Sequence, residues 1–258
     1  MRRAADLLPP LGLTVLLLAV WEAVCRLLDV PVYVLPPPSA VAVALVESGP
    51  RLAASALVTF RMALTALLVA GLIGGGLALA VSLHRTAERA VRPLAVVLQV
   101  TPVVAIAPLV LIWFGLDHAE RAVVALAAAV AFFPIFSGVL TGLKSADPDL
   151  ERLFDLYAAT PLQRLWRLRL PSALPFALEG LRVAAGQAVI GAVVAEFVSG
   201  SGATQGLAWR LLEAGNRLRT ADMLAGLACL AALGLLLNAA VALLARRLAG
   251  RSVALARD

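Results

Sequence analysis

Residues 60–83 read FRMALTALLVAGLIGGGLALAVSL, a run of 24 residues in which Arg61 is the only charged side chain. About 20 predominantly apolar residues are enough for an α-helix to cross the hydrocarbon core of a bilayer. The run therefore predicts a transmembrane helix. Five other stretches have the same character, so that six spans are predicted, over residues 9–28, 60–83, 93–116, 121–143, 173–198 and 222–245.

The composition of the whole chain also indicates a membrane protein. Of its 258 residues, 62% are hydrophobic and 15% are charged, whereas soluble domains carry about 25% charged residues. A soluble domain of this size has too little interior for so many apolar side chains, because about a quarter of its surface stays exposed. The two cysteines, Cys25 and Cys229, are too few for a disulfide scaffold, and long continuous apolar runs argue against a β-barrel. We expect an all-α membrane protein of one domain, residues 1–258.

The distribution of basic residues predicts the orientation of the spans. With a cytoplasmic N-terminus, fourteen of the 22 Lys and Arg residues fall on the cytoplasmic face and seven on the outer face, with Arg182 inside a span. Basic residues are enriched in cytoplasmic loops. Both termini are therefore predicted to be cytoplasmic, and the net charge of +6 is expected to face anionic lipid and not nucleic acid.

The loop between the fourth and fifth predicted spans, residues 144–171, contains two helix-start signals. Asp147-Pro148 and Thr160-Pro161 each place a capping side chain before a first-turn proline. We expect two short helices, over 148–158 and 161–169, that meet at an angle. On the first helix an apolar stripe is expected to bury against the chain's own helix ends, the bilayer or a partner; it consists of Leu150, Leu153, Phe154 and Tyr157. The second helix is basic, and binding to anionic headgroups is an equal alternative for it.

Several segments resemble, in order and spacing, the inner-membrane permeases of binding-protein-dependent ABC importers, in their nitrate/sulfonate/taurine branch. The segments are Leu35-Pro-Pro-Pro-Ser39, Pro102–Gly115, Phe133-Pro134-Ile135, Gly142–Ser145, Leu170–Phe176, Gly180-Leu-Arg182 and Val193–Glu196. The family's cytoplasmic loop has Glu-Ala-Ala, three residues, Gly, nine residues and Ile-x-Leu-Pro. When this pattern is anchored on Leu170-Pro171, its glycine falls on Ala158 and its isoleucine on Leu168, whereas Glu-Ala-Ala falls on 152–154, which differ. The resemblance covers residues 10–248.

The resemblance implies a type I importer permease in the bacterial inner membrane, built as a homodimer or as half of a pair. Two copies of an ATPase subunit, which bind ATP and Mg, would dock on the cytoplasmic loops. A periplasmic or lipid-anchored binding protein would deliver a small anionic or heterocyclic solute. The residues expected to couple to the ATPase are Asp149, Leu150, Leu153, Phe154, Tyr157, Ala158, Ala159 and Pro161. The atypical residues 152–154 favour a dedicated ATPase.

Motifs for ATP binding, metal binding and nucleophilic catalysis are absent from the sequence. Lys144 is the only lysine, and it is not preceded by the Gly-x4-Gly of a P-loop. The two histidines, His84 and His118, belong to no His-Glu-x-x-His or Cys/His cluster, and no Gly-x-Ser-x-Gly occurs. The chain is therefore predicted to be no enzyme, to bind no metal or cofactor, and to need another polypeptide for ATP-driven transport.

Polar and helix-breaking residues within the predicted spans are candidates for the translocation path. They are Gln99, Pro102, Pro108, Gln187 and Glu196. The glutamines could instead join helices, and Glu196 could face a partner permease or the interface. Glu179 and Arg182, at i and i+3, are expected to form a structural ion pair. The glycines at 71, 74, 75 and 76 predict close helix packing in the second span.

Two functions of other classes remain open at this point. A secondary carrier would work without an ATPase, although six spans without an internal repeat are few for one. An intramembrane enzyme is the further alternative, and the missing catalytic motifs count against it. The substrate itself cannot be identified from these residues.

Overall fold

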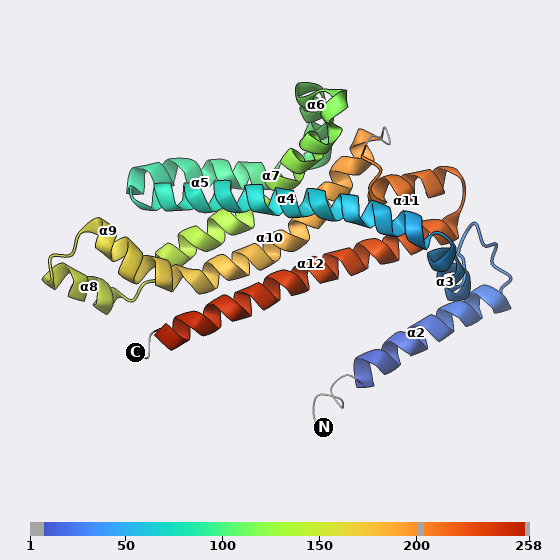
Figure 1. The fold of residues 1–258 in the computed structure, drawn as a ribbon, viewed down its shortest axis with the longest axis horizontal. Helices are drawn as coiled ribbons and strands as arrows, with labels where there is room; N and C mark the ends of the chain where they lie inside the picture. The colour runs from blue at the N-terminus through green and yellow to red at the C-terminus, as the bar shows by residue number, and fades with distance from the viewer. Residues whose placement is uncertain (1–7, 201–203, 256–258) are drawn as a thin grey trace. The chain divides into compact units, whose positions relative to one another are not determined.

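The computed structural model describes residues 8–200 and 204–255, which form helices and loops without any strand (Figure 1). The predicted all-α class is confirmed. Four of the described helices are long and apolar enough to cross a membrane: Gly49–Ser82, Ala119–Leu143, Pro161–Ser199 and Thr220–Leu248. A bent pair, Arg85–Val100 and Val103–Phe114, would make a fifth span. The helix α2 (Leu8–Leu27) covers the first predicted span but is not in this set, so the count of six stays a prediction.

The chain divides into two compact units, each of which is described by itself. The first is drawn from Met1–Leu57 and Gln205–Ala231. Its helices are α2, α3 (Pro38–Glu47), the start of α4 (Gly49–Ser82), α11 (Leu207–Asn216) and the start of α12 (Thr220–Leu255). The Glu22 carboxylate of α2 accepts a hydrogen bond from the backbone N–H of Ser39 at 3.0 Å, which joins α2 to α3, and another from Arg26 Nε of its own helix at 2.6 Å.

The second unit is drawn from Val58–Thr204 and Ala232–Asp258. It holds the remainder of α4 and α12 together with α5 (Arg85–Val100), α6 (Val103–Phe114), η1 (Leu116–His118), α7 (Ala119–Leu143), α8 (Pro148–Leu156), α9 (Pro161–Arg164), η2 (Leu165–Arg169) and α10 (Leu170–Ser199). Phe132 and Phe136 of α7 stack at 5.5 Å between ring centroids and pack with Ala78 of α4 and Ala95 of α5. The predicted single domain over 1–258 stays a prediction.

The third predicted span, residues 93–116, is not one continuous helix. The helices α5 and α6 bend by 98° at Thr101 and Pro102, and Figure 1 shows α6 leaving the direction of α5. Proline lacks a backbone N–H and disfavours the helical conformation in the residue before it, and Thr101 is extended, with φ −69° and ψ 124°. Of the two prolines expected to break this span, Pro102 does so, whereas Pro108 lies inside α6.

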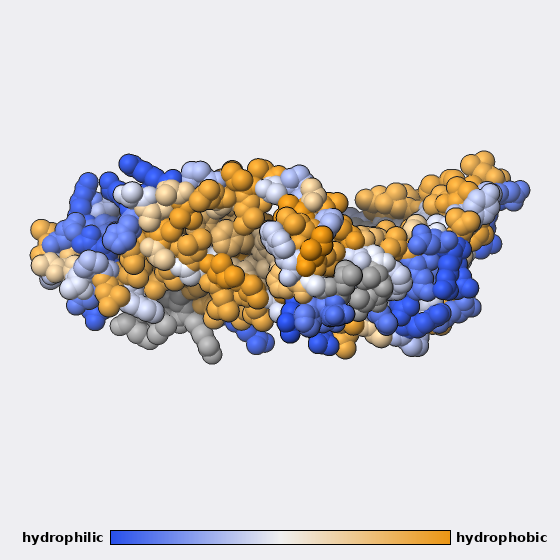
Figure 2. All heavy atoms as spheres, turned by 90° about the horizontal axis from the view of Figure 1, so that it is seen from above, coloured by the Kyte–Doolittle hydropathy of each residue, from blue (hydrophilic) through white to orange (hydrophobic). Residues whose placement is uncertain are grey.

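Large apolar side chains are exposed along the helices of the second unit. Leu72, Ile112 and Leu235 are 78%, 72% and 73% exposed. In Figure 2, orange apolar atoms are widespread on the visible face, and blue hydrophilic atoms gather in several places, one of them the end where Figure 1 places α8, α9 and the start of α5. A contiguous apolar surface of this kind is typical of helices that face lipid or a partner.

The helices α7 and α10 approach each other at four glycines. A Cβ on Gly138 would lie 2.7 Å from the Phe176 carbonyl oxygen, and one on Gly180 would lie 2.5 Å from that of Pro134. Gly142 and Gly191 are equally close to backbone atoms of the facing helix. Gly138 and Gly142 form a Gly-x-x-x-Gly pair, which lets membrane helices pack backbone to backbone. Of the glycines at 71, 74, 75 and 76 in the second predicted span, only Gly74 would bring a Cβ within 4 Å of another helix. The closest helix packing therefore lies between α7 and α10 and not along the second span.

We expect Gly180→Ala to lower the stability of the protein by about 1–3 kcal/mol, because its methyl group would overlap a backbone oxygen that cannot move away cheaply. The measurement is the thermal unfolding midpoint of the purified protein in detergent. Gly75→Ala is the matched control, because nothing lies within 4 Å of a Cβ at that position. Equal midpoints for the two variants would contradict the packing described above.

Candidate functional site

The helix α8 begins where the sequence predicts and ends earlier. The Asp147 side chain accepts a hydrogen bond from the backbone N–H of Asp149 at 2.8 Å, and Pro148 occupies the first turn. The predicted helix reached residue 158, whereas α8 ends at Leu156. Ala158 has a φ of +48°, in the left-handed region, which a right-handed helix cannot contain.

The second loop helix is not the separate short helix that was predicted over 161–169. A capping box between Thr160 and Gln163 starts α9, and the chain continues through η2, a π-helical segment, into α10 without a break. In η2 the Leu170 N–H donates to the Leu165 carbonyl, five residues back. Pro171 has no N–H for the carbonyl of Arg167, and a wider turn before it lets the helix continue. The loop helix is therefore an extension of the fifth predicted span.

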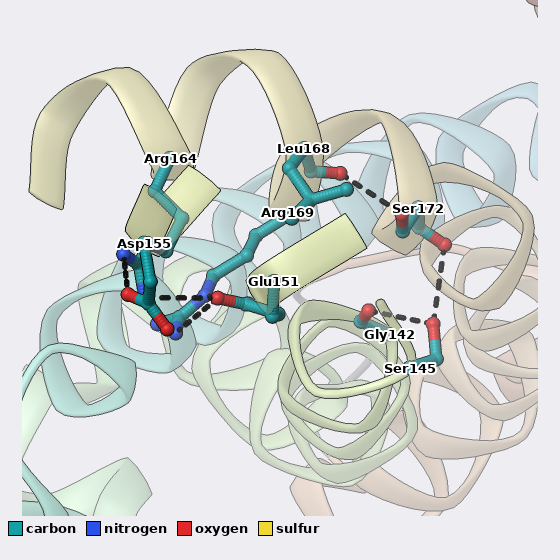
Figure 3. A network of polar contacts seen from close by, with 8 residues as sticks. All are labelled: Gly142, Ser145, Glu151, Asp155, Arg164, Leu168, Arg169 and Ser172. Carbon is teal, nitrogen blue, oxygen red and sulfur yellow. Dashed lines mark hydrogen bonds and ion pairs between the residues drawn. The ribbon is translucent and has the colours of Figure 1, made fainter. Parts of the chain in front are cut away.

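Two carboxylates of α8 form ion pairs with two arginines of this extension (Figure 3). We call this set of four residues the ion clamp: Glu151, Asp155, Arg164 and Arg169. The Glu151 carboxylate accepts from Arg169 Nε at 2.7 Å and from Arg164 Nη1 at 3.1 Å. Asp155 pairs with Arg164 as well. Multi-centre networks with partly buried partners hold geometry better than isolated surface pairs.

Further contacts fix the base of the loop. The Ser145 hydroxyl donates to the Gly142 carbonyl at 2.8 Å and lies 3.4 Å from the Ser172 carbonyl, which joins the end of α7 to the start of α10 (Figure 3). Lys144 donates to the nearly buried Glu88 of α5 at 2.5 Å. Hydrogen bonds thus hold the base of the loop against α5, α7 and α10.

The predicted apolar stripe of α8 is open along most of its length. Leu150 and Leu153 are 45% and 43% exposed, Tyr157 is 79% exposed, and Phe154 is half-buried. No residue of α8 is buried in the chain. Asp149 is exposed, and its one ion pair among the described residues is with Arg152 at 3.0 Å. Of the other predicted coupling residues, Ala159 is half-buried and Pro161 is exposed. The clamp carboxylates lie on another face of α8, about 100° or more around the helix from the centre of the stripe.

The candidate path residues fall in different places. Gln99 and Gln187 line one cavity of about 220 Å³ together with Pro134. Pro102 stands at the bend beside this cavity, and Pro108 is exposed on α6. Glu196 is 1% exposed and accepts hydrogen bonds from Thr59 at 3.0 Å and Thr204 at 2.9 Å. These contacts join α10 to α4 and to the segment before α11, and a role of Glu196 in the translocation path stays a prediction.

The predicted Glu179–Arg182 pair is not formed. No ion pair joins these residues in the described part of the chain, and both are exposed beside Arg246 of α12, at a cavity of about 300 Å³. Side chains at i and i+3 can meet, but this spacing does not force them together when solvent and other charges are near. The sequence analysis did not predict the ion clamp. Glu151 and Asp155 lie four residues apart on one face of α8, and this acidic face was the available sign that basic partners pack against it.

Comparison with known proteins gives one family. The model of the family described as the binding-protein-dependent transport system inner membrane component matches residues 68–251. The chain is 35% identical to the formylaminopyrimidine transport permease protein ThiX of Halalkalibacterium halodurans over 81% of its length and 82% of that protein. It is 32% identical to the taurine transport system permease protein TauC of Escherichia coli over 92% of its length and 87% of that protein. It shares its fold with a chain in the crystal structure of an amino acid ABC transporter with histidines, with a TM-score of 0.64, 15% identity, and coverage of 81% of this chain and 97% of that one.

We expect Ala158→Gly to slow hydrogen exchange of the α8 amides, because glycine removes the cost of about 1 kcal/mol that a Cβ carries in the left-handed region. The measurement is hydrogen–deuterium exchange of peptides that cover 147–160. Ala146→Gly is the control, because Ala146 has no positive φ and glycine there only adds freedom to the unfolded chain. Faster exchange in both variants would contradict this account of the turn.

Proposed function

Because the chain belongs to the family of binding-protein-dependent inner-membrane transport components, in the sulfonate/taurine branch of ABC importer permeases, we propose that it couples the ATP hydrolysis of a separate subunit to import through α8. It is a multi-pass protein of the bacterial inner membrane, and permease subunits of this family are not themselves enzymes. The observation that carries the proposal is the open apolar stripe of α8 beside the ion clamp.

The open stripe supports docking of a partner protein on α8. Leaving Leu150, Leu153 and Tyr157 in water is unfavourable, and burying such side chains stabilises a complex by roughly 1.5–3 kcal/mol each. The α8 segment is net acidic, with Asp149, Glu151 and Asp155 against Arg152, so the anionic inner leaflet repels it. An ATPase subunit is the partner that the family supplies.

The ion clamp supports transmission of movement from α8 into the membrane. Glu151 and Asp155 hold α8 to Arg164 and Arg169, and those arginines are on the helix that continues as α10. Salt bridges of this kind fix orientation as well as distance, since a guanidinium offers a planar fork to a carboxylate. A displacement of α8 by the ATPase would therefore move α10 and not only the loop.

We further propose the remaining parts of the assembly. Two ATPase copies bind ATP and Mg, a second copy of this permease completes the pathway, and a periplasmic or lipid-anchored binding protein delivers the solute. The relatives named above transport formylaminopyrimidine and taurine, which favours a small anionic or heterocyclic solute here. The cavity between Gln99 and Gln187 beside the α5–α6 bend is the proposed part of the translocation path.

Leu153→Asp is expected to remove the ATPase that copurifies with the tagged, detergent-extracted permease from its native cells, because a charge replaces an exposed apolar contact on the stripe. Quantitative mass spectrometry of the captured proteins is the measurement. Leu162→Asp is the control, since Leu162 is 63% exposed but lies on α9, outside the stripe. A chain that is captured alone even without substitution would favour the secondary carrier, or the intramembrane enzyme.

Arg169→Gln is expected to leave the ATPase bound and to lower the ATP turnover of the captured complex about fivefold, which corresponds to one lost ion pair of about 1 kcal/mol. Arg169→Lys, which keeps the charge without the fork, should recover part of this loss. Arg167→Gln is the matched control two residues away, because Arg167 is exposed and has no ion pair among the described residues. An equal loss in Arg167→Gln and Arg169→Gln would count against transmission through the clamp.

A further inference from the structure

A second ion pair joins the loop between α7 and α10 to the helix α5. Lys144 caps the end of α7, three residues before the Asp147 that starts α8. Its Nζ lies 2.5 Å from both carboxylate oxygens of Glu88, which is in the first turn of α5. The Glu88 side chain is 10% exposed, and Arg92 is a second cation at 3.8 Å. A nearly buried carboxylate is costly to leave without its cation, so this pair holds α5 to the loop.

The space between α8 and α5 at this level is a cavity and not a packed apolar layer. The cavity has a volume of about 480 Å³, and Glu151 of α8 and Glu88 of α5 both line it. Lys144 and Arg169 line it as well. The Lys144–Glu88 pair and the Glu151–Arg169 pair of the ion clamp therefore face the same space, and each ties the loop to a different helix.

The helix α5 leads from the Lys144–Glu88 pair to the cavity that Gln99 and Gln187 line. Glu88 and Gln99 are eleven residues apart, which is about three turns, so they share one face of α5 and lie roughly 16 Å apart along its axis. The buried Ala95 is on the same face and packs against the two stacked phenylalanines of α7. α5 is one helix between the two positions and ends one residue after Gln99, at the 98° bend.

The ion clamp leads to the same cavity along another helix. Arg169 is the last residue of η2, and Gln187 lies eighteen residues further, on α10. Eighteen residues are about five turns, so these two positions also share a helix face. Each ion pair at the loop is thus connected by one continuous helix to one of the two glutamines that line the cavity of about 220 Å³.

We propose that Lys144 and Glu88 are positioning residues of a second coupling arm, which carries a displacement of α8 along α5 to Gln99. The ion clamp is the first arm and carries the displacement along α10 to Gln187. The two arms move different walls of one cavity, so a displacement of the loop changes how open the cavity is. This inference rests on the proposed coupling through α8 and adds a route that the ion clamp does not supply.

The test places a single reactive thiol on each wall of the cavity in turn. The full chain is purified in detergent with Cys25→Ser and Cys229→Ser, which remove its two native thiols. Gln99→Cys or Gln187→Cys is then added, and the rate of modification by a maleimide is measured. A thiol reacts faster when the segment that carries it opens more often, so the two rates report on the two arms separately.

Lys144→Met is expected to raise the rate at Gln99→Cys about fivefold, the lower end of the range for coupling between sites, and to leave the rate at Gln187→Cys unchanged. Arg169→Gln should have the opposite pattern. Lys144→Arg keeps the cation and should restore the parent rate. Arg89→Gln is the matched control, because Arg89 is exposed beside Glu88 and has no ion pair among the residues that the structure describes.

Two results in the permease alone would overturn the proposal. One is an unchanged rate at Gln99→Cys in Lys144→Met, and the other is an equal rise at both thiols, which is what general loosening of the fold gives. Where Lys144→Met fails to fold, Lys144→Met combined with Glu88→Gln gives the same test, because no buried carboxylate is then left without its cation.

The same thiols in the complex with the captured ATPase separate this inference from the proposed function. A non-hydrolysable ATP analogue with Mg is expected to change both rates in the parent, and in Lys144→Met to change the rate at Gln187→Cys alone. A change at both thiols in Lys144→Met would overturn the second arm and leave the coupling through α8 in place. A chain that captures no ATPase would refute that coupling, and the rates in the permease alone would still decide whether the Lys144–Glu88 pair acts on position 99.

Discussion

Backbone meets backbone where α7 and α10 cross, because glycines at 138, 142, 180 and 191 leave no Cβ between the two helices. Lipid offers apolar side chains the same surroundings as a protein interior does, so membrane helices gain little from hydrophobic burial against each other and depend on close van der Waals contact. The pair formed in this way carries at one end the loop of α8 and α9, on which we propose that an ATPase docks. The proposed docking site takes its position from this pair.

The proposed transmission of a displacement through the loop depends on how α8 is held. One face of α8 presents apolar side chains outward, and another face holds Arg164 and Arg169 through Glu151 and Asp155. The arginines belong to a helix that continues through the π-helical segment into α10, so the loop has no flexible joint at its second end. The remaining joint is the left-handed turn at Ala158, where the chain reverses between α8 and α9.

Local signals in the sequence predicted the elements better than the contacts between them. Asp147-Pro148 and Thr160-Pro161 located the starts of α8 and α9, because capping depends only on neighbouring backbone groups. The predicted end of the second loop helix at residue 169 was wrong, because a wider turn accommodates Pro171 and the helix continues into α10. The Glu179–Arg182 pair failed for a related reason: helical spacing makes such a pair possible, but competing surroundings decide whether it forms.

The candidate sites were predictable to different extents. The stripe of Leu150, Leu153 and Tyr157 follows from helical periodicity alone, and the structure leaves these three residues exposed. The ion clamp joins residues from separate helices, and the spacing of Glu151 and Asp155 on α8 does not by itself identify their partners, Arg164 and Arg169. The sequence by itself determined that this is a helical membrane protein, because apolar run length and turn chemistry are local properties, and the order and spacing of its motifs resemble those of ABC importer permeases. Only the tertiary structure decided which charges pair and which stay open, because pairing depends on how distant helices cross.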